Sequence, residues 1–219
     1  MNAARQEKSL ARRLALPALG GAIAGFVATF LFLNLTDADA GAGAGPGISR
    51  EIAGIVGISY ILGAIGGCIG IVNPRLGARF LNVEDADELR EQRRMFGYAF
   101  TAMMALGAAL FLLAFVEPAG SIGGRAGAAA ALGLVLVACI LGHLQARHVD
   151  ELQRLLSRES IATAFYLLFA IGGGWALLAH CGLTAAPAPL DWLTMFAATL
   201  LAGCLWQAGR RGLLTRGPS

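Results

Sequence analysis

Residues 82–94 read NVEDADELREQRR, the densest run of charge in a chain of 219 residues. Five acids and three arginines stand here between two long apolar runs. A weaker copy of the pattern, HVDELQRLLSRES at residues 148–160, is also flanked by apolar runs. We interpret both stretches as the starts of long helices, because the positive end of the helix dipole favours acidic residues in the first turn. These helix roots are predicted at about 84–94 and 149–160.

The rest of the chain is apolar, with 57% hydrophobic and 14% charged residues. Crossing roughly 30 Å of hydrocarbon takes about 20 apolar residues in a helix. Six windows without Asp, Glu, Lys or Arg approach or exceed that length. The sequence therefore predicts an all-α, multi-pass membrane protein with a single domain over residues 1–219. Its six transmembrane helices are predicted at about 14–35, 52–72, 95–116, 126–144, 161–179 and 192–208.

The first apolar run resembles a secretory signal, because basic residues precede it and Ala38-Asp39-Ala40 follows it. A signal core has roughly 7–15 apolar residues. The run at 14–36 is longer than that, so we expect it to be retained as the first span.

Basic residues lie almost entirely in alternate connections. Fifteen of the seventeen Lys and Arg residues belong to the N-terminus, the 73–94 loop, the 143–159 loop and the C-terminus. Basic flanks disfavour translocation, so these segments are predicted to be cytoplasmic. The localisation that follows is a bacterial-type cell inner membrane, with both the N- and C-termini cytoplasmic.

Glycine is concentrated in two predicted spans. In the span at 52–72, small residues at helical spacing form one groove: Ser59, Gly63, Gly66, Gly67 and Gly70. Such grooves let membrane helices approach closely, which predicts a central position for this helix. In the span at 161–179, Gly172, Gly173 and Gly174 turn through most of the circumference, so they cannot all face one neighbour. The glycines of both sets are candidate close-packing or hinge positions.

The sequence suggests two different internal repeats, which exclude one another. The second and fifth spans are the middle helices of a possible 3+3 inverted repeat, and glycine-interrupted middle spans are typical of a transporter site. The repeated Asp-Glu-Leu at 87–89 and 150–152 instead relates the third and fifth spans in the same orientation. That relation suits three stacked hairpins, and the sequence alone does not decide whether either repeat is real.

The two Asp-Glu-Leu segments are also candidate cytoplasmic interaction sites, through Asp87, Glu88, Arg90, Asp150, Glu151 and Arg154. The spacings Asp87–Arg90, Glu151–Arg154 and Asp150–Arg154 favour ion pairs along a helix. Surface ion pairs at helix starts explain these residues without a catalytic role. His143 and His148 are five residues apart and turn about 140° from one another, which disfavours a shared metal ion.

Common catalytic and nucleotide-binding motifs are absent from the sequence, and no basic face of the kind that binds nucleic acid is present. We predict no catalytic residues, no metal and no cofactor. The favoured function is a non-enzymatic accessory protein or complex subunit. Its predicted partners are the lipid bilayer and either another membrane protein or further copies of itself. The alternative is a small-solute transporter that works through the glycine-interrupted second and fifth spans.

Overall fold

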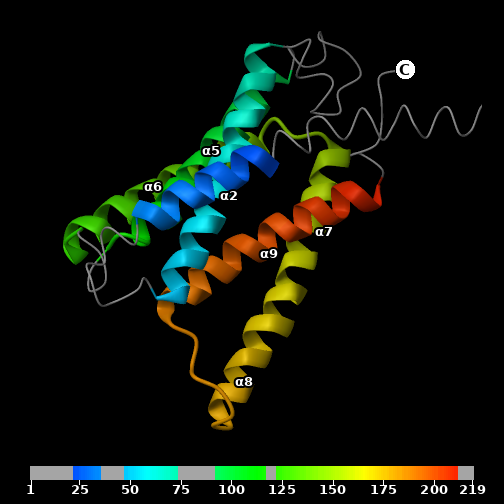
Figure 1. The fold of residues 1–219 in the computed structure, drawn as a ribbon. Helices are drawn as coiled ribbons and strands as arrows, with labels where there is room; N and C mark the ends of the chain where they lie inside the picture. The colour runs from blue at the N-terminus through cyan, green and yellow to red at the C-terminus, as the bar shows by residue number, and fades with distance from the viewer. Residues whose placement is uncertain (1–21, 36–46, 74–91, 117–121, 212–219) are drawn as a thin grey trace, which may run out of the picture.

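The computed structural model describes residues 22–35, 47–73, 92–116 and 122–211, and this part of the chain is all-α (Figure 1). Its helices are Ala22–Leu35, α2 (Ile48–Val72), α5 (Arg93–Leu113), α6 (Gly124–Ala146), α7 (Glu151–Leu168), α8 (Gly174–His180) and α9 (Pro189–Arg210). A π-helical turn, η1 (Phe169–Gly173), joins α7 to α8. The segment Glu151–His180 is therefore one continuous helix of 30 residues, called the α7–α8 helix below.

In the described part of the chain, five helices are long and apolar enough to cross a membrane: α2, α5, α6, the α7–α8 helix and α9. They correspond to five of the six predicted spans. The helix Ala22–Leu35 is apolar but shorter, and residues 14–21 of the predicted first span lie outside the described residues. Most helices extend beyond the uncharged windows, because charged residues occupy their terminal turns.

Side-chain contacts show that five helix ends lie at one end of the molecule: the starts of α5 and α7 and the ends of α2, α6 and α9. The Gln153 amide donates to Gln92 Oε1 at 3.2 Å, which joins the starts of α7 and α5. The rings of Tyr98 and His148 lie 5.7 Å apart, which brings the end of α6 to the same place. The ends of α2 and α9 lie there as well, because both helices run antiparallel to their main neighbours, α5 and α7. We call this the basic end of the molecule, since six described arginines lie at or near these helix ends: Arg93, Arg94, Arg147, Arg154, Arg210 and Arg211.

The closest approach between α2 and α5 is made by two glycines. A Cβ atom on Gly57 would lie 2.8 Å from the Gly107 carbonyl oxygen, and one on Gly107 would lie 2.7 Å from the Gly57 carbonyl oxygen. Real Cβ atoms essentially never come this close to backbone. The crossing therefore depends on glycine at both positions, as is typical of membrane helix pairs.

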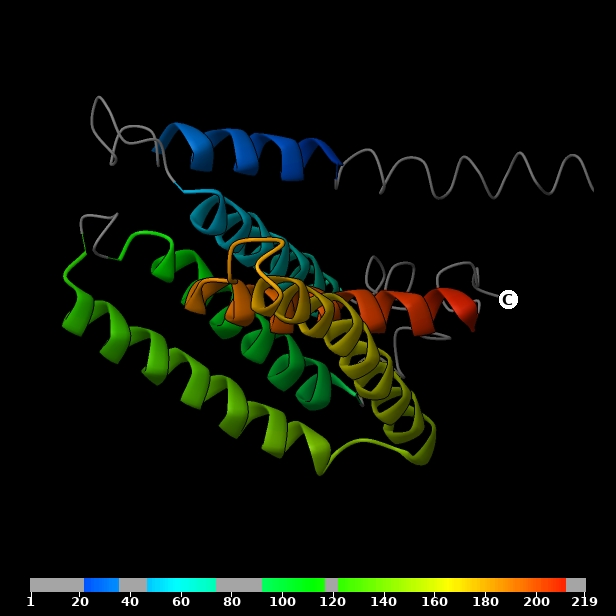
Figure 2. The same cartoon turned by 90° about the horizontal axis from the view of Figure 1, so that it is seen from below.

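A phenylalanine cluster holds the helix Ala22–Leu35 against this pair. Phe32 is 1% exposed and lies over Gly54 of α2. Its ring centroid is 5.5 Å from that of Phe111 and 5.8 Å from that of Phe115. Aromatic pairs at such distances add about 0.5–1.5 kcal/mol beyond the area that they bury. Figure 2 shows this helix and α6 on opposite sides of α2 and α5.

Arg50 precedes the predicted span at 52–72 but belongs to the helix that contains this span. It lies in the first turn of α2 and is 7% exposed. Its Nε donates to the carbonyl oxygen of Ala114, the C-cap residue of α5, at 2.5 Å. The negative end of a helix dipole favours a cation at this position. Arg50 therefore joins the two helices at the end opposite to the basic end.

The α7–α8 helix and α9 form the second close pair. A Cβ atom on Gly203 would lie 2.6 Å from the Ser160 carbonyl oxygen, so the crossing again depends on glycine. Pro189 occupies the first turn of α9, and the Asp191 carboxylate accepts the N–H of Ala188 at 2.6 Å. Beyond the crossing, α8 extends away from the other helices, and the chain returns to α9 (Figure 1).

Candidate functional site

The predicted helix start at Asp150 is present in the structure. Asp150 is the N-cap of α7, and its Oδ1 accepts the N–H of Gln153 at 2.7 Å. The predicted ion pairs of Arg154 with Asp150 and Glu151 are wrong: neither acid forms an ion pair with Arg154 among the described residues. The nearby N–H groups at the helix start engage the Asp150 carboxylate instead. Glu151 and Arg154 remain exposed.

The first Asp-Glu-Leu segment cannot be compared with the second one. Asp87, Glu88 and Arg90 lie outside the described residues, and α5 is described from Arg93 onward, with Gln92 as its N-cap. The relation between the two segments therefore stays a prediction.

The buried face of α2 includes only part of the predicted groove. Ser59, Gly63 and Gly66 are exposed, and a Cβ atom on Gly66 would have no described atom within 4 Å. Gly67 and Gly70 are buried, as the groove required. The buried stripe that contains them runs through Ala53, Gly57, Tyr60, Ala64, Gly67 and Gly70.

Gly67 lies against the Phe100 ring, which would overlap an added Cβ atom. Gly63 would meet only the flexible Met103 side chain, with Cε at 2.6 Å from the added Cβ atom. Within one chain, close packing therefore concerns Gly67 but not Gly66. Two rows of small residues lie side by side on α2, and the row without Gly66 faces α5, so a close-packing role for Gly66 stays a prediction.

The glycine triplet lies at the π-helical turn. Gly172 is buried, and an added Cβ atom would lie 2.9 Å from Cζ3 of Trp192 on α9. Among the described residues, an added Cβ atom on Gly173 would meet only Phe169 Cδ2 at 3.9 Å, and one on Gly174 would meet no atom within 4 Å. The three glycines thus face different surroundings, as their positions on a helix predict. π-helical turns are rare and occur frequently at functional sites.

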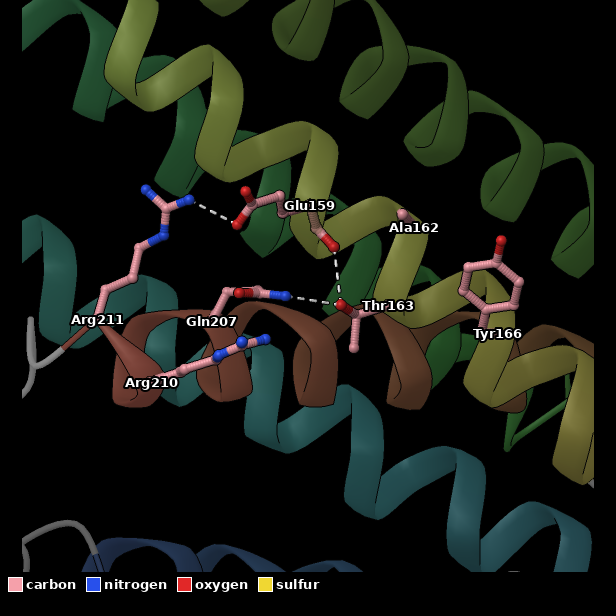
Figure 3. A pocket seen from close by; sticks show the side chains of 7 residues that line it. All are labelled: Glu159, Ala162, Thr163, Tyr166, Gln207, Arg210 and Arg211. Atoms are coloured by element: carbon pink, nitrogen blue, oxygen red, sulfur yellow. Dashed lines mark hydrogen bonds and ion pairs between the residues drawn. The ribbon is translucent and has the colours of Figure 1, made fainter.

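A polar cleft between α7 and α9 was not predicted from the sequence. It lies at the basic end, has a volume of about 470 Å³, and is shown in Figure 3. Its polar lining consists of Glu159, Thr163, Tyr166, Gln207, Arg210 and Arg211. We call this feature the α7–α9 cleft.

Hydrogen bonds tie the two walls of the α7–α9 cleft together. Gln207 is 7% exposed, and its Nε2 donates to Thr163 Oγ1 at 2.8 Å. The Thr163 hydroxyl in turn donates to the Glu159 carbonyl oxygen at 2.8 Å. Arg211 Nη2 lies 2.6 Å from Glu159 Oε2, so an ion pair joins the end of α9 to α7. A fixed polar wall therefore lies directly beside the apolar surface of the bundle.

The spacing of small and polar residues could have indicated this cleft. On α9, Thr199, Gly203 and Gln207 recur every four residues and are all buried, and on α7 the buried Ser160 and Ala164 do the same. These are small-residue patterns of membrane helix interfaces, and Gln207 extends one of them by a turn. The sequence-based search looked for clustered charge and glycine, so it passed over them.

The two histidines considered as metal ligands, His143 and His148, each interact with a residue of the end of α6 instead. His143 Nε2 lies 3.3 Å from Arg147 Nη2, and His148 Nδ1 lies 3.0 Å from the Leu144 carbonyl oxygen. In the described ranges, no three His, Cys, Asp or Glu residues lie close enough together to hold a metal ion.

No protein-family model, curated protein or solved structure matches the chain significantly. Its class therefore rests on the fold. By the length and composition of its five long helices, the chain is a multi-pass membrane protein embedded in a lipid bilayer.

Proposed function

We propose that this protein is a non-enzymatic subunit or accessory protein of a bacterial-type inner membrane, with both termini in the cytoplasm. The orientation is supported by the fifteen basic residues in alternate connections, since such residues are retained on the cytoplasmic side. Each of the five long helices of the described part has one end at the basic end, which agrees with that orientation.

The proposal rests mainly on one observation: little of the surface of the α7–α8 helix is covered by the other helices of the described part. Only 11% of its most apolar window is buried inside the chain, and α9 is the one other helix along which it packs extensively in the described part. Phe165, Tyr166 and Phe169 project from it and are 60–70% exposed. Aromatic residues are enriched at protein interfaces, where they bury much area with few rotatable bonds. A helix of a partner membrane protein, or of another copy, would cover this face.

The start of α7 offers a second contact for the same partner. Glu151 and Arg154 are exposed, and neither has an ion-pair partner among the described residues. Both are therefore available at the membrane surface, directly beyond the aromatic face. The partner would present complementary charge there.

The proposal is tested by site-specific photocrosslinking in native membranes. A photoreactive residue at Phe169 should give a discrete crosslinked protein product that co-purifies in stoichiometric amounts in mild detergent. The matched control is Leu136, a similarly exposed residue of α6, which should give mainly lipid adducts. Lipid adducts alone at both positions would show that the α7–α8 helix is simply lipid-facing.

The orientation is tested separately with a reporter that is active only outside the cytoplasm. Fusions after Ser121 and Pro187 should be active, and fusions after Arg147 and Arg211 should be inactive. A reversed result at any of these sites would contradict the assigned topology.

A small-solute transporter is the second candidate, and the π-helical turn favours it. Gly172 packs on Trp192 while Gly173 and Gly174 are nearly free of contacts, so the α7–α8 helix has a point at which it could bend. Substrate-dependent thermal stabilisation of the isolated protein would favour this function. A stoichiometric protein partner would favour the first one.

A further inference from the structure

Only one of the two arginines in the α7–α9 cleft forms an ion pair among the described residues. Two arginines and one glutamate line it, which leaves one net positive charge. Arg211 pairs with Glu159 at 2.6 Å, whereas Arg210 is exposed and has no ion-pair partner among the described residues. The guanidinium of Arg210 lies beside Gln207 at the cleft (Figure 3). The cleft therefore combines one unneutralised guanidinium with a fixed polar wall.

The height of the cleft along α9 matches a membrane surface. The uncharged run of α9 ends at Gly209, and Arg210 follows it directly. Trp206 lies one turn earlier and is 64% exposed, as is typical of aromatic anchors at the interface between lipid and water. A bilayer whose apolar core ends with the uncharged run of α9 would place Arg210 at the level of the phospholipid phosphates.

The apolar surface beside the cleft continues toward the membrane centre. Tyr166 is part of the cleft and is 70% exposed, and Phe169 continues the same helix surface one turn further and is also 70% exposed. A molecule with an anionic head and hydrocarbon chains would meet the arginine and this apolar surface together. A free anion would bind only the arginine.

We infer that the α7–α9 cleft binds the phosphate of an anionic phospholipid headgroup. Arg210 supplies the charge, and guanidinium groups form strong hydrogen bonds to phosphate oxygens. Arg211 contributes less, because Glu159 already engages it. Basic pockets between membrane helices are known to take phospholipid headgroups. The inference does not depend on the function proposed above. In a subunit the lipid would share the exposed surface of the α7–α8 helix with the partner helix, and in a transporter it would meet that surface alone, while the headgroup binds at Arg210 in both cases.

The test uses the full chain, delipidated in dodecylmaltoside micelles, with phosphatidylglycerol and phosphatidylcholine as probes at constant ionic strength. Native mass spectrometry measures the apparent dissociation constant for each lipid. Wild type should prefer phosphatidylglycerol, and Arg210→Gln should weaken that binding about tenfold, the effect of losing one charged hydrogen bond. The matched control is Arg154→Gln, which removes an exposed arginine of α7 outside the cleft and should change the affinity less than about twofold.

A second variant keeps the test decisive if Arg210→Gln folds poorly. Glu159→Gln removes the negative charge from the cleft and releases Arg211, so phosphatidylglycerol should bind about fivefold more tightly. Misfolding cannot produce tighter binding. A loss of affinity in this variant would overturn the inference, as would equal losses in Arg210→Gln and Arg154→Gln or the absence of lipid preference in wild type. Displacement of phosphatidylglycerol by millimolar inorganic phosphate would assign the site to the free ion and overturn the lipid assignment; no displacement supports it.

Discussion

Replacing Gly57 by alanine tests the crossing of α2 and α5. The added Cβ atom would lie 2.8 Å from the Gly107 carbonyl oxygen and 2.8 Å from the Phe111 backbone nitrogen. Ordinary contact begins at 3.4 Å, and neither obstacle is a flexible side chain. The helices must therefore separate by about 0.6 Å, a gap that forfeits roughly a quarter to a half of each dispersion contact nearby. Overpacking of this kind costs about 1–3 kcal/mol.

The same substitution improves the helix propensity of α2 by about 1 kcal/mol, which would mask part of the loss. Gly66→Ala measures this gain in helix propensity alone, because Gly66 lies on the same helix and an added Cβ there would have no described atom within 4 Å. Subtracting its effect isolates the cost of overpacking at Gly57. The difference in unfolding free energy between the two variants should therefore be about 1–3 kcal/mol, with Gly57→Ala the less stable.

The measurement is reversible unfolding in mixed dodecylmaltoside and SDS micelles, followed by circular dichroism. Gly107→Ala should behave like Gly57→Ala, and the double variant should cost less than the sum, because both changes separate the same two helices. Equal stability of Gly57→Ala and Gly66→Ala would refute the close crossing. Additive losses at Gly57 and Gly107 would mean that the two glycines do not act on one contact.

Three further predictions concern local features, each checked by unfolding in the same micelles. Asp150→Ala should destabilise the protein by about 1 kcal/mol because it removes the N-cap of α7, whereas Glu151→Ala should stay within about 0.5 kcal/mol; similar losses in both would contradict the capping role. Arg50→Ala should cost about 1–3 kcal/mol, because a buried carbonyl oxygen loses its charged donor, and an unchanged stability would mean that water replaces that donor. Gly173→Ala should leave the stability unchanged or raise it by up to about 1 kcal/mol, while Gly172→Ala should lower it; the reverse order would contradict the observed packing of the π-helical turn.

Helix positions could be predicted from the sequence more reliably than helix faces. The absence of charge over about 20 residues is a strong signal for a span, and five such helices are present. The glycine pattern did not single out the face of α2 that packs on α5, because Gly66 and Gly67 are adjacent and the pattern fits two neighbouring stripes equally well. Counting Ala53 and Ala64 as small residues would have favoured the stripe that is buried.

The α7–α9 cleft could not be predicted because it requires knowing which helices are neighbours. Thr163 and Gln207 are 44 residues apart, and each alone looks like an isolated polar residue near a helix end. The burial of Arg50 could not be predicted for a related reason. A cation near the start of a span is usually assigned to water, and only the Ala114 carbonyl oxygen at the end of α5 explains its burial.

The π-helical turn affects the chain as a one-residue insertion into an α-helix would. Each residue of an α-helix advances about 100° around the axis, so the side chains of α8 are rotated by that amount from the register of α7. In this register Trp175 Nε1 donates to the Ala185 carbonyl oxygen at 2.8 Å, across the connection that leads back to α9. Loss of a single codon from the glycine triplet would therefore remove the inserted residue and leave an ordinary α-helix, in which Trp175 keeps its place opposite its acceptor. Loss of one residue elsewhere in α7 or α8 has no inserted residue to remove, so it would turn the far end of the helix by about 100°.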